Sequence, residues 1–139
     1  MDVRKLIDYA LEARKKAYVP YSGFLVGAAL MDSNGNVHTG CNIENAAYTP
    51  SNCAERTAFF KAVSEGHYSF DAIAIVGGKG DEPLDYCAPC GVCRQVMMEF
   101  CDPDQFRIIL AKSKDVYKEY SLSELLPIGF GPKNLNPLM

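Results

Sequence analysis

The sequence has no long hydrophobic run and no extended basic run. No stretch approaches the roughly 18 consecutive apolar residues that a membrane-spanning helix needs, and no apolar signal region follows the first residues. The largest basic cluster is Arg14-Lys15-Lys16, typical of the solvated face of a helix, and the net charge is −3. These absences argue against a membrane, secreted or polynucleotide-binding protein, and we expect a cytoplasmic location.

Histidine is also scarce, because the chain has only His38 and His67. Their positions match no known metal-ligand spacing, so we expect each of them on the surface rather than at a metal. Internal repeats and low-complexity segments are absent as well. The sequence therefore offers cysteine rather than histidine as the candidate metal ligand.

The 139 residues fit one ordinary domain, and a hydrophobic content of 48% is sufficient for a substantial core. We therefore treat residues 1–139 as a single domain. Six cysteines could form three disulfides, but three of them fall within residues 87–93 and no signal region is present. Metal binding by reduced thiols explains that clustering better.

Hydrophobic periodicity predicts helices alternating with strands. Residues 2–17 repeat apolar side chains every three or four positions, whereas 24–31 and 71–78 are nearly continuous apolar runs typical of buried strands. An Asn34-Gly35 turn and strands at 37–41, 106–111 and 116–120 are also expected. Further helices should begin after a cap at Thr49, Ser51 or Asn52 and after Cys90, and a short helix should follow a capping box at Ser121–Glu124.

This order predicts a three-layer α/β fold. An antiparallel hairpin should lie at one end of the sheet, with parallel pairing where helices intervene. In such folds ligands bind where the strands end and the helices begin, and both cysteine segments fall at such positions.

Two cysteine segments form the strongest functional signal: Cys53-Ala54-Glu55-Arg56 and Pro89-Cys90-Gly91-Val92-Cys93. A C-x-x-C pair where a loop meets a helix can hold one zinc ion, and Cys53 can supply a third thiolate. Three protein ligands leave a position open for water, as in catalytic zinc sites. Glu55 can serve the same site only if Cys53 lies at the start of its helix, and Arg56 should then share the face of Cys53.

Alternative interpretations of these residues remain. With Asn52 as the helix cap, Glu55 could complete a capping box, and Arg56 could form a surface ion pair. Cys87 extends the C-x-x-C pattern, which permits an iron–sulfur site or a closed four-thiolate structural zinc. A zinc-stabilised binding module without turnover would keep the thiolates and give Glu55 no role.

A polar loop, Asn42-Ile43-Glu44-Asn45-Ala46-Ala47-Tyr48, precedes the first cysteine segment. Its amides, carboxylate and phenol are suited to hydrogen bonding with hydroxyl groups. An ordinary surface loop is an equally good interpretation of the same residues.

Taken together, five segments closely resemble the small homotetrameric cytidine deaminases: residues 19–24, 40–46, 52–58, 88–95 and 125–132. The resemblance covers nearly the whole chain. It implies an α/β/α sandwich around a five-stranded mixed sheet. It also implies zinc-dependent hydrolysis of cytidine and 2′-deoxycytidine to uridine and 2′-deoxyuridine, with release of ammonia, in pyrimidine salvage.

The resemblance also implies a role for individual residues. One Zn²⁺ per chain would be bound by Cys53, Cys90 and Cys93, with Glu55 as the catalytic proton shuttle supported by Arg56. The substrate-binding residues would be Asn42 and Glu44 for the ribose, Phe24 and Phe130 for the base, and Ala46, Tyr48 and backbone groups near Ala54. Tyr48 would approach from a neighbouring subunit, and Phe130 would cover the pyrimidine bound by a neighbour in a homotetramer with shared active sites.

Two features depart from the family pattern. Cys87 stands where a non-ligand residue is expected, and the connection over residues 77–86 is slightly longer than usual. Blasticidin S deaminases share the two cysteine segments and are the nearest competing assignment. Asn42, Glu44 and Phe130 favour the nucleoside.

Overall fold

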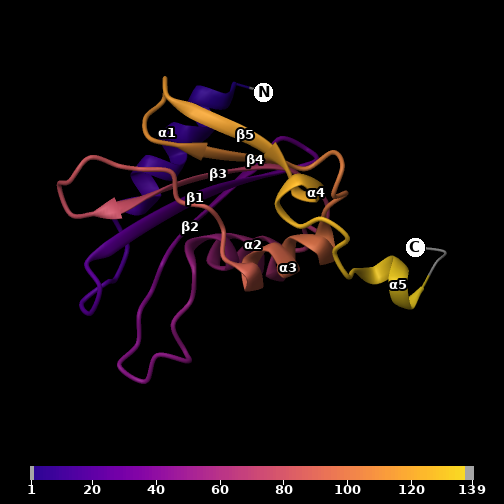
Figure 1. Ribbon diagram of the computed structural model, residues 1–139, viewed down its shortest axis with the longest axis horizontal. Helices are drawn as coiled ribbons and strands as arrows, with labels where there is room; N and C mark the ends of the chain where they lie inside the picture. Colours follow the sequence, from indigo (N-terminus) through magenta and orange to yellow (C-terminus); the bar gives the residue numbers. More distant parts are fainter. Residues whose placement is uncertain (1, 137–139) are drawn as a thin grey trace.

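A five-stranded sheet forms the centre of the molecule, and the computed structural model describes residues 2–136 of the chain (Figure 1). The strand order is β2-β1-β3-β4-β5. The strands are β1 (Phe24–Asp32), β2 (Val37–Cys41), β3 (Phe70–Lys79), β4 (Arg107–Ala111) and β5 (Tyr117–Ser121). Only β3 and β4 pair in parallel, and the other neighbouring strands are antiparallel.

One face of the sheet is covered by α1 (Val3–Arg14). Its buried residues pack against small side chains of the sheet, and Gly27 on β1 permits this approach: a Cβ there would lie 2.1 Å from the carbonyl oxygen of Ala10. The side chain of Arg14 donates hydrogen bonds to the carbonyl oxygens of Leu25 at 3.1 Å and Gly78 at 2.7 Å. These contacts fix α1 across β1 and β3.

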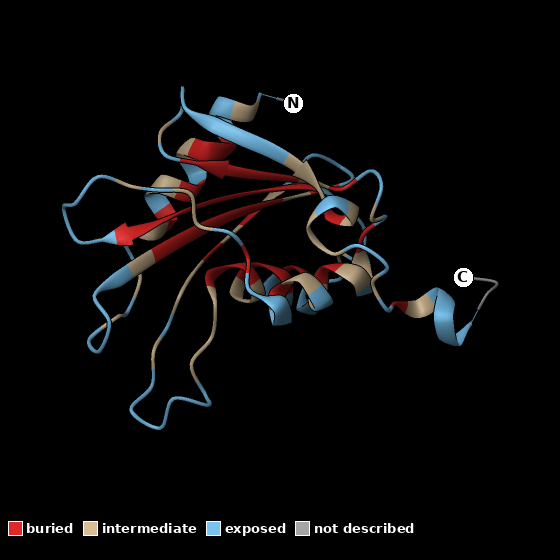
Figure 2. Ribbon diagram, viewed as in Figure 1, coloured by how far each residue is buried: buried red, intermediate tan, exposed pale blue. Residues whose placement is uncertain are grey.

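The opposite face is covered by α2 (Ala54–Ser64) and α3 (Gly91–Phe100). Their inward side chains, including Phe59 and Met97, join the larger hydrophobic core, and Figure 2 shows that burial is concentrated in β1, β3, β4 and the inner sides of the helices. Two short helices follow β5: α4 (Leu122–Leu125), which is adjacent to α3, and α5 (Pro132–Leu135), which projects from the body of the molecule (Figure 1).

The three-layer α/β architecture and the order of elements predicted from the sequence are confirmed. The predicted capping box is also present, since Ser121 and Glu124 cap the start of α4. The predicted cap of α2 is wrong, because Cys53 rather than Thr49, Ser51 or Asn52 occupies the N-cap position. The first helix ends at Arg14 and not at residue 17, and residues after it form a turn.

The predicted surface position of His38 is wrong. His38 is buried at the β2 edge of the sheet, where its ring contacts Asp32 and His67, and His67 itself is half-buried. Periodicity in the short strand β2 did not indicate that this polar side chain faces inward. Among the described residues, no helix has both the length and the apolar character needed to cross a membrane.

Candidate active site

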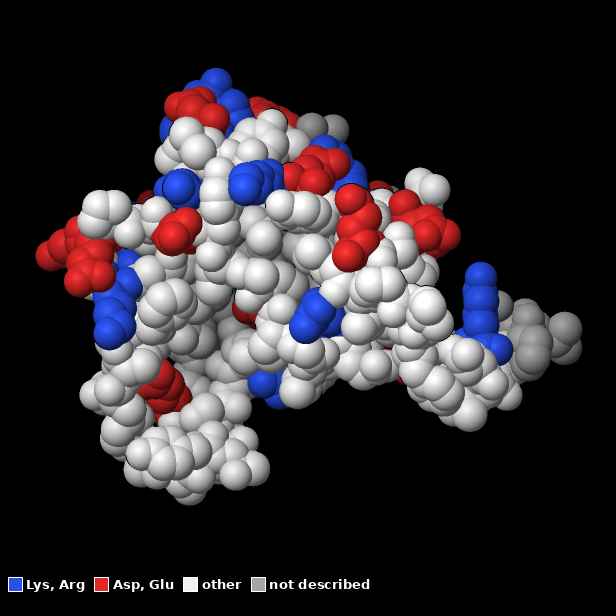
Figure 3. Space-filling model, in the orientation of Figure 1, with Lys and Arg blue, Asp and Glu red and all other residues white. Residues whose placement is uncertain are grey.

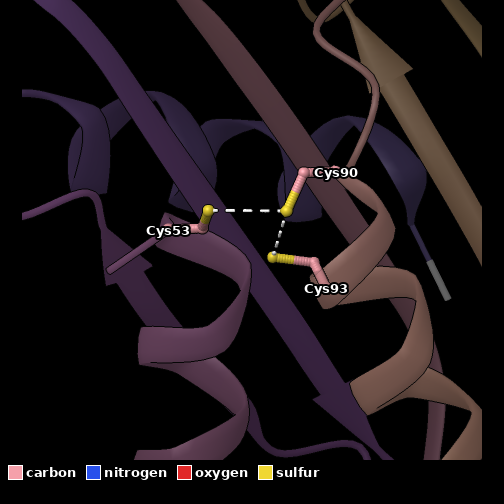
Figure 4. A group of neighbouring side chains, drawn as sticks. All are labelled: Cys53, Cys90 and Cys93. Atoms are coloured by element: carbon pink, nitrogen blue, oxygen red, sulfur yellow. Dashed lines mark hydrogen bonds between the residues drawn. The ribbon is translucent and has the colours of Figure 1, made fainter. Parts of the chain in front are cut away.

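Two helix starts bring three thiols together on one side of the sheet. Cys53 is the N-cap of α2, Cys90 is the N-cap of α3, and Cys93 lies in the first turn of α3. Neither N-cap thiol caps its own helix. Figure 4 shows the three sulfur atoms directed toward one another from the two helices.

The spacing of the sulfur atoms fits a single tetrahedral ion. The Sγ atoms of Cys53 and Cys90 are 3.7 Å apart, and those of Cys90 and Cys93 are 3.5 Å apart. Two ligands at a Zn–S distance of about 2.3 Å and tetrahedral angles are separated by about 3.8 Å. All three cysteines are free, so reduced thiols are available to hold a metal.

The electrostatics differ between the thiols of the cluster: they favour a thiolate at Cys53, whereas the hydrogen bond with Cys53 and burial raise the pKa of Cys93. A hydrogen bond from Cys93 lowers the pKa of Cys53 to about 5, against the opposing effect of burial, and a hydrogen bond from Arg56 contributes to the decrease. The Arg56 Nη2 atom lies 3.2 Å from the Cys53 Sγ atom. The positive ends of α2 and α3 act in the same direction, because negative charge is stabilised at helix N-termini. Arg56 thus lies on the same face as Cys53, as the three-residue spacing indicated.

Glu55 is buried within the first turn of α2 beside the thiols, with an exposed fraction of 4%. Burial raises the pKa of this carboxyl to about 7, and the negative charge of Cys53 adds to the increase. Since Cys53 is the N-cap, Glu55 is the second helical residue and not the third. That position excludes the capping-box interpretation, and a buried carboxyl that titrates near neutrality can both accept and return a proton.

Cys87 does not join the three clustered thiols. It is packed against β3, where a Cβ on Gly77 would lie 2.9 Å from its Sγ atom. Burial raises the pKa of the Cys87 thiol to about 11, and the negative charges of Glu55 and Cys53 also raise it. A thiol outside the cluster is inconsistent with a four-thiolate structural site.

The loop after β2 is held against the start of β1 by two of the predicted ribose-binding residues. The Asn42 side chain accepts from the Val26 N–H at 2.9 Å and donates to the Phe24 carbonyl oxygen at 2.8 Å. The Glu44 carboxylate accepts from the backbone N–H of Tyr21 at 3.0 Å and from the hydroxyl of Ser22, and this hydroxyl lowers the pKa of Glu44. Both side chains are therefore fixed in position before any ligand arrives.

The remaining predicted residues differ in their surroundings. Ala54 is fully buried at the start of α2, and Ala46 is exposed in the loop. The Phe24 ring contacts the same part of β3 as Cys87, because both lie near Gly77. Figure 3 shows that the surface is hollowed between the loop over residues 42–53 and the helices, with acidic and basic groups scattered around it.

Tyr48 and Phe130 are predicted substrate-binding residues whose aromatic side chains are largely exposed in this subunit. Tyr48 is 76% exposed and has a positive φ of 62° at the tip of its loop. The Phe130 side chain is 58% exposed, although its carbonyl oxygen accepts a hydrogen bond from the Gln95 side chain at 2.8 Å. The structure therefore fixes the backbone at Phe130 next to α3 and leaves the ring free of the core.

Comparison with known proteins identifies the family. Residues 1–108 match the model of the cytidine and deoxycytidylate deaminase zinc-binding region. The chain belongs to the cytidine deaminase family. A cytidine deaminase of Sporosarcina psychrophila is 49% identical over 98% of this chain and 96% of its own length, and one from Halalkalibacterium halodurans is 48% identical over 98% and 99%.

Solved structures of cytidine deaminases share the fold. The structure from Burkholderia pseudomallei has a TM-score of 0.84 and 45% identity, covering 94% of this chain and all of that chain. The structure from Mycobacterium tuberculosis has a TM-score of 0.79 and 36% identity, covering 94% and 98%. The predicted five-stranded deaminase fold is thereby confirmed, and the chain is an enzyme of this family.

Sequence reasoning missed the partners that orient the deaminase residues. Ser22 and the backbone of Tyr21 hold Glu44, and Gln95 holds the backbone at Phe130. The Pro-Tyr-Ser-Gly turn and the Gln after the C-x-x-C segment were the available signals. Neither sequence motif indicates which distant residue its side chains contact.

Proposed function

We propose that this chain catalyses the hydrolytic deamination of cytidine and 2′-deoxycytidine to uridine and 2′-deoxyuridine, releasing ammonia, in pyrimidine salvage. The observation that carries the proposal is a buried Glu55 beside three thiols whose sulfur atoms lie within 4.8 Å of one another. Residues 1–139 act in this proposal as one cytoplasmic catalytic domain.

Cys53, Cys90 and Cys93 would hold one Zn²⁺ per chain. Zinc bound by three protein ligands supplies Lewis acidity and lowers the pKa of water from 15.7 toward 7. Arg56 offsets the negative charge of the thiolates through its contact with Cys53. This compensation is needed because three thiolates exceed the charge of one divalent ion.

Glu55 is the proton carrier of the proposed reaction. Its carboxylate takes a proton from the attacking water, whose oxygen forms a bond to C4 of the pyrimidine, and delivers the proton to N3. The same group then takes the remaining proton from the C4 hydroxyl and transfers it to the amine while the C4–N bond breaks, which releases ammonia and leaves the C4 carbonyl. A pKa near neutrality suits a group that serves first as base and then as acid.

In this proposal the loop that contains Asn42 and Glu44 binds the ribose, and the start of β1 lies beside the base. Asn42 and Glu44 would bind ribose hydroxyls, with Glu44 oriented by the hydrogen bonds from Tyr21 and Ser22. Phe24, Ala46 and the backbone near Ala54 would border the base. The location of Phe24 beside Cys87 supports a base pocket that reaches from β3 toward the thiols.

The active site is completed between subunits of a homotetramer in this proposal. Tyr48 and Phe130 would extend from one subunit into the site of a neighbour. Their exposure supports this role, as does the projection of α5 directly after Phe130 (Figure 1). Packing of the Phe130 ring on its own subunit is the alternative.

An ammonia-release assay tests the proposal. Zinc-loaded protein is assayed with cytidine, 2′-deoxycytidine, cytosine and blasticidin S, and Glu55→Gln protein serves as the matched control. We expect turnover of both nucleosides and none of the free base. Turnover of blasticidin S alone would reassign the substrate, and zinc binding without any ammonia release would indicate a binding module.

A further inference from the structure

A second cluster of potential metal ligands lies at the far end of α2 from the cysteines. Asp32 ends β1, His38 lies on β2, and His67 follows the C-terminus of α2. The Nε2 atom of His38 is 2.9 Å from Oδ2 of Asp32, and the Nδ1 atom of His67 is 3.1 Å from the same oxygen. The ligand atoms of all three residues lie within 4.8 Å of one another.

We propose that Asp32, His38 and His67 form a second metal site, which binds a divalent first-row transition ion, with zinc as its first occupant. Tetrahedral zinc ligands at about 2.1 Å are separated by about 3.4 Å, so the rings, now 2.9 and 3.1 Å from Oδ2, need to move by only a few tenths of an ångström to hold an ion between them. Two imidazoles and one carboxylate select zinc and its neighbours over magnesium or calcium, which prefer oxygen ligands.

The carboxylate of this cluster is buried and held by hydrogen bonds. Asp32 accepts from His38 and from the turn residues Asn34 and Asn36. The Oδ1 atom accepts the backbone N–H groups of Asn34 at 2.9 Å and Asn36 at 3.0 Å. Oδ2 accepts from the side-chain amide of Asn36 at 3.2 Å and faces the two imidazoles.

The site is open on one side. A cavity of about 220 Å³ is bordered by Asp32, His67 and the residues beside them, and the His67 side chain is 32% exposed. An ion can therefore reach the site, and the cavity has space for water ligands. The backbone N–H of His67 bonds to the Ala62 carbonyl oxygen at 3.0 Å, which places the ring at the negative end of α2. That end of a helix favours a cation.

Ion binding requires only a rearrangement of protons on the rings. In the absence of an ion, His38 and His67 can each donate an N–H to Asp32. When the ion binds, any proton on Nε2 of His38 or Nδ1 of His67 moves to the other ring nitrogen or to solvent, so that the lone pairs of these two atoms face the metal. No oxidation or further reactant is needed.

An ion bound at this site would link the β1–β2 hairpin to the end of α2. An ion bound only by the native state adds stability by mass action. The midpoint of thermal unfolding should therefore increase with added zinc, beyond the increase due to the cysteine site. This inference is independent of the proposed deamination.

Zinc titration of the purified, untagged holoprotein tests the site. The protein first receives one equivalent of zinc and is then dialysed against zinc at up to 100-fold molar excess. We expect a second bound equivalent in the unmodified chain and only one in His67→Gln. Ser69→Ala, at the border of the same cavity, is the matched control and should bind two. Cytidine turnover of His67→Gln should remain within twofold of the unmodified enzyme.

Nuclear magnetic resonance of the unmodified chain provides a second measurement that needs no variant. Because the chain has only two histidines, ¹⁵N signals of the imidazoles report this site alone. The second equivalent of zinc should shift the ring nitrogens of both His38 and His67. Unshifted rings in a protein that binds one equivalent would overturn the proposal and reduce the cluster to hydrogen bonds, as would a second equivalent retained in His67→Gln.

Discussion

The two ends of α2 carry clusters of opposite chemical character. At its N-terminus Cys53 meets Cys90 and Cys93, and thiolates there are stabilised by helix dipoles and by Arg56. Beyond its C-terminus His67 meets Asp32, whose negative charge is stabilised by His38 and by the backbone N–H groups of Asn34 and Asn36. The helix therefore stabilises thiolate ligands at its N-terminus and positive charge at its C-terminus.

Glu55→Gln should have the largest effect and should affect only the cysteine end. The substitution keeps the size of the side chain and removes the base, so we expect kcat for cytidine to decrease by at least roughly 10²- to 10⁴-fold. Zinc content, measured by mass spectrometry of the elements, should remain at one per chain. Nearly normal turnover would disprove the role of Glu55 as proton carrier.

Arg56→Gln should affect only the cysteine end of α2, because it removes the positive group that contacts Cys53. Partners of metal ligands typically contribute 10- to 100-fold to metal affinity or activity, so we expect a decrease of that order in kcat/KM. Arg56→Lys retains the charge and should recover part of the loss. An unchanged kcat/KM in both variants would show that Arg56 forms only a surface contact.

Phe130→Ala tests whether the active site at the cysteines, in contrast to the histidine cluster, includes a residue from another subunit. Stacking of an aromatic ring on a base contributes about 1 to 3 kcal/mol, so KM for cytidine should increase roughly 5- to 150-fold with unchanged zinc content. Tyr9→Ala, on α1, is the control and should leave KM unchanged.

Mixing Phe130→Ala with Glu55→Gln provides the complementary test. If subunits exchange, some hybrid sites combine an intact Glu55 with an intact Phe130, and part of the activity should return. Sedimentation analysis of the unmodified enzyme should show a tetramer. A fully active monomer would contradict shared active sites.

Asp32→Asn should have the smallest effect, and only on stability. Because the pKa of Asp32 is lowered from 3.8 to about 2, the carboxylate contributes about 2 kcal/mol to the free energy of unfolding at neutral pH. That contribution is complete above the unfolded value of 3.8 and is lost as the pH falls toward 2. Urea unfolding without excess zinc should show a difference between the two proteins that decreases as the pH falls from 4 toward 2.

Turnover of cytidine by Asp32→Asn provides the control for that measurement. We expect kcat and KM within twofold of the unmodified enzyme, because the hairpin lies at the opposite end of α2 from Glu55. A stability difference that does not depend on pH would assign the effect to shape rather than to charge.

The sequence alone determined most elements of the fold and the main features of the cysteine site. Periodicity is a local property, so it predicted the helices and strands, and the C-x-x-C segment predicted two ligands because they lie on one helical turn. Resemblance added the five-stranded sheet and the expected substrate, which residue spacing could not supply. The start of α2 was misassigned because Thr49, Ser51, Asn52 and Cys53 are all possible first residues, and only packing chose Cys53.

The tertiary structure alone decided which distant residues meet. Asp32, His38 and His67 come from a strand end, a short strand and a post-helix loop, with no common spacing, so their contact depends on β1–β2 pairing and on how α2 lies across the sheet. The same holds for Glu44 with Ser22 and for Gln95 with Phe130. Contacts between distant segments arise from burial of the whole core, and a pattern of neighbouring residues cannot predict them.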